Sequence, residues 1–282
     1  MMILESLLFY ALVLLATGVA VGFSCGLLGI GGGFLMVPVQ IWVLTSTGVD
    51  PTLATRIAFG TSLAVVLPTA LSGCRSHSCL GVVLWRPGVI MGLCGLLGAF
   101  LGGSIAAHAP GDLLRMLFGF VVLLGALRML FARNLLLGQE ALPGETRESL
   151  LKYVFWGLVV GVISGLTGIG GGVILVPAMV IAMGYSMYQA IGTSSVTIAF
   201  NAVGGVIAYA ISGWGAPGLP MYCVGYIDLM QFALLAGASI FTASWGVKVA
   251  HRLPAEKLRY IFVMLMVYIG LKMIGVLGWA GL

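Results

Sequence analysis

The stretch Gly26-Leu-Leu-Gly-Ile-Gly-Gly-Gly-Phe-Leu-Met-Val-Pro38 returns later in the chain as Gly165-Leu-Thr-Gly-Ile-Gly-Gly-Gly-Val-Ile-Leu-Val-Pro177. Nine of the thirteen positions are identical. The segment Gly60-Thr61-Ser62 likewise matches Gly192-Thr193-Ser194. Matches that keep their order along the chain indicate an internal duplication, so the sequence predicts two related halves.

The composition places these repeated segments in a membrane. Of the 282 residues, 61% are hydrophobic and 7% are charged, whereas soluble globular domains carry about 25% charged residues. The 43 glycines are typical of a packed transmembrane bundle, in which small residues let helix backbones approach closely. A soluble enzyme, a nucleic-acid-binding protein and a disordered protein are therefore excluded, and a polytopic membrane protein is indicated.

Eight apolar stretches meet or approach the length of about 20 residues that a helix needs to cross the hydrocarbon core. They cover roughly residues 7–28, 54–73, 87–107, 111–131, 151–168, 188–212, 229–250 and 256–277. The first lacks a preceding basic segment and is longer than a signal peptide, so we expect a span there. Two shorter pieces, 34–46 and 173–184, are too short to span alone, and we expect half-helices or re-entrant segments.

A polar stretch divides the chain near its middle. It predicts a first transmembrane repeat at residues 1–131, a linker at 132–149 and a second transmembrane repeat at 150–282. The expected fold is an all-α integral membrane protein. It has about eight long transmembrane helices and two short re-entrant segments, arranged as two internal repeats.

Corresponding loops of the two halves carry opposite charge bias. Arg75 and Arg86 in the first half have no basic counterparts in the second, whereas the four basic residues within 248–259 correspond only to Arg115. By the positive-inside rule, this exchange predicts that the two repeats are inverted relative to each other. Inversion needs an odd number of crossings per half, which we expect to be about five.

The two glycine blocks, Gly29–Gly33 and Gly168–Gly172, predict helix breaks in the middle of the membrane. Each glycine inside a helix costs about 1 kcal/mol relative to alanine, and unwound backbone at that depth must be buried in protein or line a cavity. Half-helices that begin there direct their N–H groups at a site suited to an anion. The residues expected at that site are Gly31, Gly32, Gly33, Gly170, Gly171 and Gly172. Close packing between helices is the alternative interpretation.

Polar side chains near the glycine blocks are further candidates for the substrate site. Hydroxyl groups can donate hydrogen bonds to an oxyanion, and polar groups inside a membrane are functional candidates by default. The structural alternatives are hydrogen bonds between helices for the hydroxyl and amide groups, and an interfacial anchor for the arginine. The candidates are Thr61, Ser62, Thr193, Ser194, Arg56, Asn201 and Gln40.

The titratable residues do not suggest catalysis or metal binding. Acidic and histidine residues fall in loops or at the ends of spans, so we expect no catalytic residue, no metal site and no cofactor. Cys74 and Cys79 flank a polar segment. The two thiols are able to pair if that segment is a loop in an oxidising compartment.

At the paired glycine blocks and the Gly-Thr-Ser segments, the sequence resembles the TauE/SafE sulfite exporter family, also called the toluene sulfonate uptake permease family. The resemblance covers essentially the whole chain. It implies a secondary-active transporter of small sulfur-containing anions, such as sulfite, thiosulfate or organosulfonates, in the bacterial inner (plasma) membrane. Pro38 and Pro177 also match the family's motif, but the second half has Tyr188-Gln189 at the position of Arg56. We therefore do not expect the two halves to bind substrate equivalently.

The sequence thus predicts a permease or exporter that moves a small anion by alternating access, coupled to a proton gradient across the lipid bilayer, with no nucleic-acid partner. Two alternatives stay open. One is a transporter of another small solute, and the other is a membrane assembly factor or enzyme. The sequence also leaves open the exact substrate, the direction of transport, the oligomeric state and the orientation in the membrane.

Overall fold

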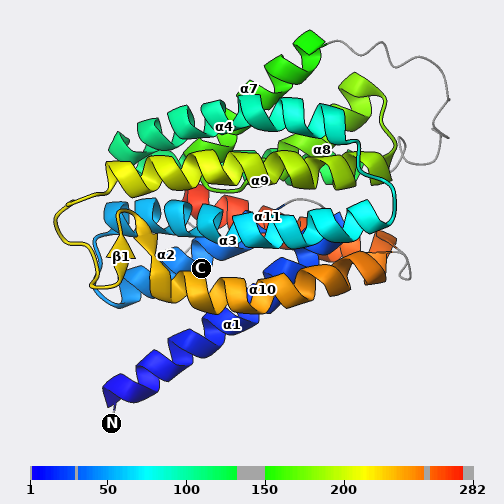
Figure 1. Ribbon diagram of the computed structural model, residues 1–282. Coiled ribbons are helices and arrows are strands. Elements are labelled where there is room, and N and C mark those ends of the chain that lie inside the picture. Colours follow the sequence, from blue (N-terminus) through cyan, green and yellow to red (C-terminus); the bar gives the residue numbers. More distant parts are fainter. Residues whose placement is uncertain (1, 29–30, 132–149, 251–254, 276–282) are drawn as a thin grey trace.

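The computed structural model describes residues 2–28, 31–131, 150–250 and 255–275, and this part of the chain is almost entirely helical. The predicted linker 132–149 lies outside the described residues. Most helices run along one common direction (Figure 1). The elements are α1 (Met2–Leu28), α2 (Gly33–Ser46), α3 (Pro51–Cys79), α4 (Trp85–His108), α5 (Gly111–Phe131), α7 (Leu150–Thr167), α8 (Gly172–Met183), α9 (Met187–Ser212), β1 (Cys223–Val224), β2 (Ile227–Asp228), α10 (Leu229–Ala250) and α11 (Ala255–Ile274).

The two ends of the bundle are formed by different connections. Residues 47–50, 109–110 and 213–228 form end A, and residues 80–84 and 184–186 form end B. At end A, the Arg56 guanidinium donates to Ala109 O at 3.0 Å and so joins the start of α3 to the end of α4. At end B, Leu84 N donates to Thr193 Oγ1 at 3.0 Å and joins the start of α4 to α9.

The two short apolar helices return along the helices that precede them. The Tyr10 and Trp42 rings lie 5.7 Å apart, so α1 and α2 are antiparallel and form hairpin 1, which is open at end A. Tyr153 and Tyr185 are joined by a hydrogen bond of 2.7 Å between their hydroxyl groups, so α7 and α8 form hairpin 2, which is open at end B. The two short helices thus fold back along the helices before them, and their re-entry into the membrane stays a prediction.

The second half traverses the bundle in the direction opposite to the first. Helices α3 and α5 run from end A to end B, and α4 returns from B to A. Their counterparts run in the opposite directions, with α9 and α11 from B to A and α10 from A to B; α3, α4, α9 and α10 are seen in Figure 1. Each half thus has three helices that run along the bundle and one hairpin, and the number of about five membrane crossings per half stays a prediction. Three is also an odd number, and the opposite directions are what inverted repeats require.

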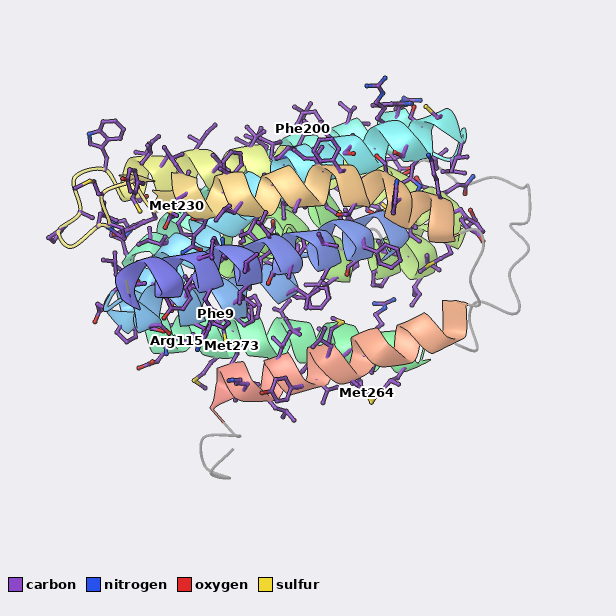
Figure 2. All side chains as sticks on the ribbon, turned by 90° about the horizontal axis from the view of Figure 1, so that it is seen from below. Phe9, Arg115, Phe200, Met230, Met264 and Met273 are labelled. Atoms are coloured by element: carbon purple, nitrogen blue, oxygen red, sulfur yellow. The ribbon has the colours of Figure 1, made fainter. Side chains whose placement is uncertain are left out.

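Six of the described helices are long and apolar enough to cross a membrane, namely α1, α3, α4, α7, α9 and α10. The all-α membrane fold is therefore confirmed, and the count of eight spans stays a prediction. Helix α5 has 21 residues but carries Asp112, Arg115 and Arg128. Large apolar side chains such as Phe9 and Met264 lie on the outside of the bundle (Figure 2), where 55% and 66% of their surfaces are exposed. Such a surface suits lipid.

Glycines join the two halves by close helix contacts. A Cβ added at Gly157 would lie 2.5 Å from Met91 O, so α7 packs directly on the backbone of α4. In the same way, a Cβ at Gly18 would lie 2.7 Å from Leu235 O, and α1 packs on α10. Small residues therefore let each hairpin lie against a helix of the other half, as in other small-residue membrane interfaces.

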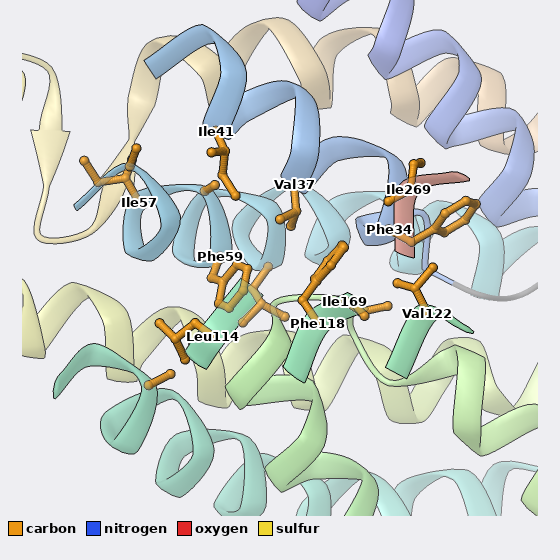
Figure 3. Close-up of a cluster of buried hydrophobic side chains, with 14 of the residues drawn as sticks. Phe34, Val37, Ile41, Ile57, Phe59, Leu114, Phe118, Val122, Ile169 and Ile269 are labelled. Atoms are coloured by element: carbon orange, nitrogen blue, oxygen red, sulfur yellow. The ribbon is translucent and has the colours of Figure 1, made fainter. Parts of the chain in front are cut away.

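The hydrophobic core is also shared by both halves. Figure 3 shows Phe34 of α2, Phe59 of α3 and Phe118 of α5 in one cluster with Ile169, which precedes α8, and Ile269 of α11. The Phe59 and Phe118 rings stack with their centroids 5.9 Å apart. The two predicted repeats thus bury their apolar side chains together rather than in two separate cores.

The segment between Cys74 and Cys79 differs from the loop that its polarity suggests. It is the last part of α3, which continues to Cys79. Cys74 is buried, Cys79 is exposed, and both thiols are free. The helix continues because α3 leaves the apolar core only at its last turns, where Ser76, His77 and Ser78 reach end B.

Labelling from the two sides of the membrane will test the opposite placement of Ser76 near end B and Gly218 in end A. We replace the accessible Cys79 and Cys223 by Ser and introduce one cysteine, by Ser76→Cys or Gly218→Cys. We expect an impermeant maleimide to label the two variants from opposite faces of oriented membrane vesicles. Labelling of both from one face would contradict the inverted arrangement.

Candidate functional site

The two glycine blocks meet between the ends of the bundle. Gly32 and Gly171 precede α2 and α8 with φ values of 67° and 86°, a left-handed conformation that glycine adopts without steric cost. A Cβ added at Gly33 would lie 2.7 Å from Ile169 Cα, and one at Gly31 would lie 3.0 Å from Ile169 O. The tips of the two hairpins are therefore in direct contact.

Both half-helices begin at this contact and run away from it, α2 toward end A and α8 toward end B. Neither Gly32 nor Gly171 has a side chain that can cap its helix. The first N–H groups and the positive dipole ends of two helices are thus directed at one region, an arrangement that favours an anion.

Two apolar side chains enclose the tips in a symmetric manner. Val66 of α3 and Ile198 of α9 both lie within 3.9 Å of Cβ atoms added at Gly31 and Gly170. Both side chains are buried, with exposed fractions of 0% and 1%. Electrostatic interactions are stronger where apolar side chains exclude water, so the partial charges of the helix ends act strongly here.

Unpartnered polar groups surround the tip of hairpin 2. The Asn201 side chain is fully buried, and neither its amide nitrogen nor its amide oxygen has a hydrogen-bond partner. Its nitrogen lies 3.2 Å from the position of a Cβ added at Gly171, and its oxygen lies against Gly95. Ser164 Cβ lies 3.3 Å from the same Cβ position, and Ser164 Oγ is also buried without a partner. Each such buried group costs about 1–3 kcal/mol.

The tip of hairpin 1 is satisfied internally. Thr69 of α3 donates to Val65 O at 2.8 Å, and its hydroxyl is 2.8 Å from the hydroxyl of Ser239 on α10. The Cys25 side chain lies within hydrogen-bonding range of the Gly31 backbone. The polar groups at this tip therefore bond to one another.

The predicted hydroxyl candidates have separate positions. Thr61 Oγ1 accepts a hydrogen bond from Asp228 N at 2.9 Å, just as Thr193 Oγ1 accepts one from Leu84 N. Each threonine thus bonds to the residue at or next to the start of a helix in the other half. Ser62 donates to Gly168 O at 2.6 Å and lies at the tip of hairpin 2.

Ser194 donates to Ile191 O at 2.8 Å on its own helix. The candidates Gln40 and Arg56 lie away from the hairpin tips. Gln40 is fully buried on α2, seven residues after Gly33 or about 10 Å along the helix. Neither its amide nitrogen nor its amide oxygen has a hydrogen-bond partner.

Substitution of the two threonines will separate a structural from a binding role. We expect Thr61→Val and Thr193→Val each to lower stability by about 1 kcal/mol, because a backbone N–H loses its acceptor. Thermal unfolding in detergent measures this, with the apparent KM for substrate measured in parallel. A raised KM at unchanged unfolding temperature would instead assign the hydroxyl to substrate binding.

Arg56 lies at end A rather than at the hairpin tips. It lines a cavity of about 700 Å³ between the turn at 47–50 and the segment 216–220. Its guanidinium lies 5.9 Å from the centre of the Tyr226 ring, and its Nε atom is buried without a hydrogen-bond partner. Arg56 can therefore attract an anion to the mouth of the bundle.

Asp228 is the buried acidic side chain among the described residues, with 7% of its surface exposed. Its carboxylate accepts from Met230 N at 2.9 Å and Gln231 N at 3.0 Å and so caps the start of α10. Burial raises the pKa of this carboxyl, and the two backbone N–H groups oppose the shift. Among the residues that the structure describes, no three His, Cys, Asp or Glu side chains gather as a metal site.

The sequence analysis did not name Ser164 as a candidate site residue. The repeat alignment contained a signal for it, because Ser164 precedes Gly165 just as Cys25 precedes Gly26. The second repeat therefore has a hydroxyl group where the first has a thiol, and this difference in polarity between the repeats is visible in the sequence.

Comparison with known proteins identifies similar chains along almost the whole length. The family model described as sulfite exporter TauE/SafE matches residues 14–273. A probable membrane transporter protein of Haemophilus influenzae is 30% identical, with 94% of this chain and 98% of that protein aligned. A probable membrane transporter protein of Methanocaldococcus jannaschii is 26% identical, over 94% and 97% of the two chains. One of Xylella fastidiosa is 36% identical over 66% of this chain and 69% of its own. No solved structure matches.

Proposed function

The chain belongs to the TauE/SafE sulfite exporter family and is a multi-pass bacterial membrane transporter, and from this premise we propose its substrate and mechanism. We propose a secondary-active permease or exporter for a small sulfur-containing anion, such as sulfite, thiosulfate or an organosulfonate. Its role is transport rather than catalysis.

The contact between the hairpin tips is the observation that carries this proposal. Two helix N-termini without side-chain caps, at Gly32 and Gly171, are buried together between the ends of the bundle. Sulfur oxyanions and sulfonates present several oxygen acceptors around one centre, which several N–H and O–H groups can bind together.

The two hairpins suggest how access alternates. Hairpin 1 reaches the site from end A and hairpin 2 reaches it from end B, so each occupies the route from one side. In the proposed cycle, the hairpins move in turn, and the anion at their tips is exposed first to one end and then to the other. The two inverted repeats supply these equivalent gates.

The charge distribution supports an orientation and a coupling ion. Among the described residues, Arg75, Arg86, Arg128, Lys152 and Lys248 lie near end B, whereas the three basic residues Arg56, Arg115 and Lys272 lie near end A together with Asp50, Asp112 and Asp228. By the positive-inside rule, end B is the cytoplasmic end. Asp228, buried and with a raised pKa, is then the carboxyl group that takes up protons from the external side.

The function is tested by uptake into proteoliposomes that contain the purified protein. Radiolabelled sulfite, thiosulfate and methanesulfonate are supplied separately, with and without an imposed pH gradient. We expect saturable uptake of one of these anions that increases with the gradient. If none of them moves, the sulfur-anion assignment is wrong, and other anions are then screened in the same vesicles.

Asp228→Asn will test the coupling. The amide oxygen can still accept from Met230 N and Gln231 N, so the cap of α10 is retained, but the side chain no longer binds a proton. We expect gradient-driven accumulation to be lost, while exchange of labelled for unlabelled substrate continues. Gradient-driven accumulation at the wild-type level would contradict a role of Asp228 in coupling.

A further inference from the structure

The two hairpin tips are built alike in backbone but differ in their side chains. In the first half, the residue that corresponds to Asn201 is Thr69, whose hydroxyl is bonded to Val65 O and to the hydroxyl of Ser239, which lies against Gly22 of hairpin 1. Asn201 itself lies beside Gly171 at the tip of hairpin 2, and its amide is fully buried without a partner. The polar groups of one tip are thus satisfied within the chain, and those of the other are not.

We propose that the substrate is bound at the tip of hairpin 2 alone, by the Asn201 amide nitrogen, the Ser164 hydroxyl and the first N–H groups of α8, and that it is a monoanion of the sulfonate type. This inference rests on the proposed transport function. It assigns binding to one half, with hairpin 1 closing the site rather than contacting the anion through side chains.

The donors at this tip converge on the start of α8. The Asn201 amide nitrogen lies 3.2 Å from the Cβ position of Gly171, and Ser164 Cβ lies 3.3 Å from it. Among the described residues, neither Gly172 N nor Val173 N donates to a backbone oxygen, and the first such bonds of this helix come from Ile174 and Leu175. The Asn201 amide, the Ser164 side chain and the start of α8 therefore lie together around Gly171.

The charge of the site favours a monoanion. The helix end contributes a partial positive charge of about half a unit, and the other donors are neutral amide and hydroxyl groups. Arg128 bonds to Pro177 O on the same hairpin, five residues or about 7.5 Å along α8 from Gly172. Burying a second negative charge without a cation beside it is costly, so a sulfonate or hydrogen sulfite fits better than sulfate.

Matched substitutions in the two halves test the assignment. Asn201→Asp keeps the size of the side chain but adds a negative charge, and Ser164→Ala removes one hydroxyl. The counterparts in the first half are Thr69→Val and Cys25→Ala. The readouts are proteoliposome uptake of methanesulfonate and the thermal stabilisation of each purified variant by methanesulfonate, with sulfate as the dianion control.

We expect Asn201→Asp to weaken methanesulfonate binding at least about tenfold and Ser164→Ala about threefold or more, with the first-half variants within about twofold of the wild type. If Asn201→Asp fails to fold, the inference is tested by comparing methanesulfonate binding by Ser164→Ala with that by Cys25→Ala. Equal losses in both halves, or wild-type binding in both second-half variants, overturn the inference while transport itself stands. Stronger stabilisation by sulfate than by methanesulfonate overturns the monoanion assignment. If the wild type neither moves methanesulfonate nor is stabilised by it, both the inference and the sulfonate function are wrong.

Discussion

Gly171→Val is expected to abolish uptake while the protein still inserts into the membrane. Gly171 has φ of 86°, and a side chain in this left-handed conformation costs about 1–2 kcal/mol. The added Cβ would also lie 2.7 Å from Val160 Cγ1 and 3.2 Å from the Asn201 amide nitrogen. The valine therefore displaces the start of α8, where we place the anion. Uptake per unit of folded protein is the measurement.

The matched control is Gly184→Val at the other end of the same helix. Gly184 has φ of 73°, but nothing lies within 4 Å of its added Cβ. This variant shares the backbone strain and leaves the hairpin tip untouched. We expect Gly184→Val to lose only the stability that the backbone strain costs and Gly171→Val to lose more because of its contacts with Val160 and Asn201, with uptake per folded protein lost only in Gly171→Val. Equal loss of uptake in both would attribute the effect to strain in α8.

Gly165→Leu is expected to prevent stable folding. A Cβ at this position would lie 2.6 Å from Gly103 N and 3.0 Å from Ala99 C on α4. These are backbone atoms, which cannot turn aside as a flexible side chain can, so α7 and α4 must separate. We expect a loss of about 3 kcal/mol or more, seen as aggregation on size-exclusion chromatography and a lowered unfolding temperature.

Gly237→Leu on α10 provides the comparison. Gly237 is also a helical glycine, but nothing lies within 4 Å of its added Cβ, and it is exposed on the surface of the bundle. We expect an unfolding temperature close to that of the wild type. A comparable loss in both variants would show that glycine content, and not the contact with α4, determines stability.

The helices and their breaks could be predicted from local sequence patterns. The short segments predicted at 34–46 and 173–184 are Gly33–Ser46 and Gly172–Met183 in the structure. Apolar length and consecutive glycines act within a few residues, so no tertiary information is needed to find them. The repeat added the expectation that the two breaks are equivalent.

The role of each polar side chain depended on contacts that local sequence does not contain. Thr61 and Thr193 look like substrate ligands beside the glycine blocks, but their hydroxyl groups accept from backbone N–H groups 167 and 109 residues away. Ser164 lies inside an apolar run, and only the packing of α7 against α8 brings it beside Gly171. Arg56 likewise reaches Ala109 only because α4 ends beside the start of α3.

Because each hairpin packs on a helix of the other half, the two hairpins find their partner helices at different times during synthesis. Gly161 of hairpin 2 packs against Gly95, which is made 66 residues earlier, so this hairpin has its partner as soon as it leaves the ribosome. Gly22 of hairpin 1 packs against Ser239, 217 residues later. Hairpin 1 enters the bilayer first, but it can pack against α10 only after nearly the whole chain has been made. Its glycine-lined face stays open to lipid and to quality-control proteases during that time, and truncated chains will carry it unpaired.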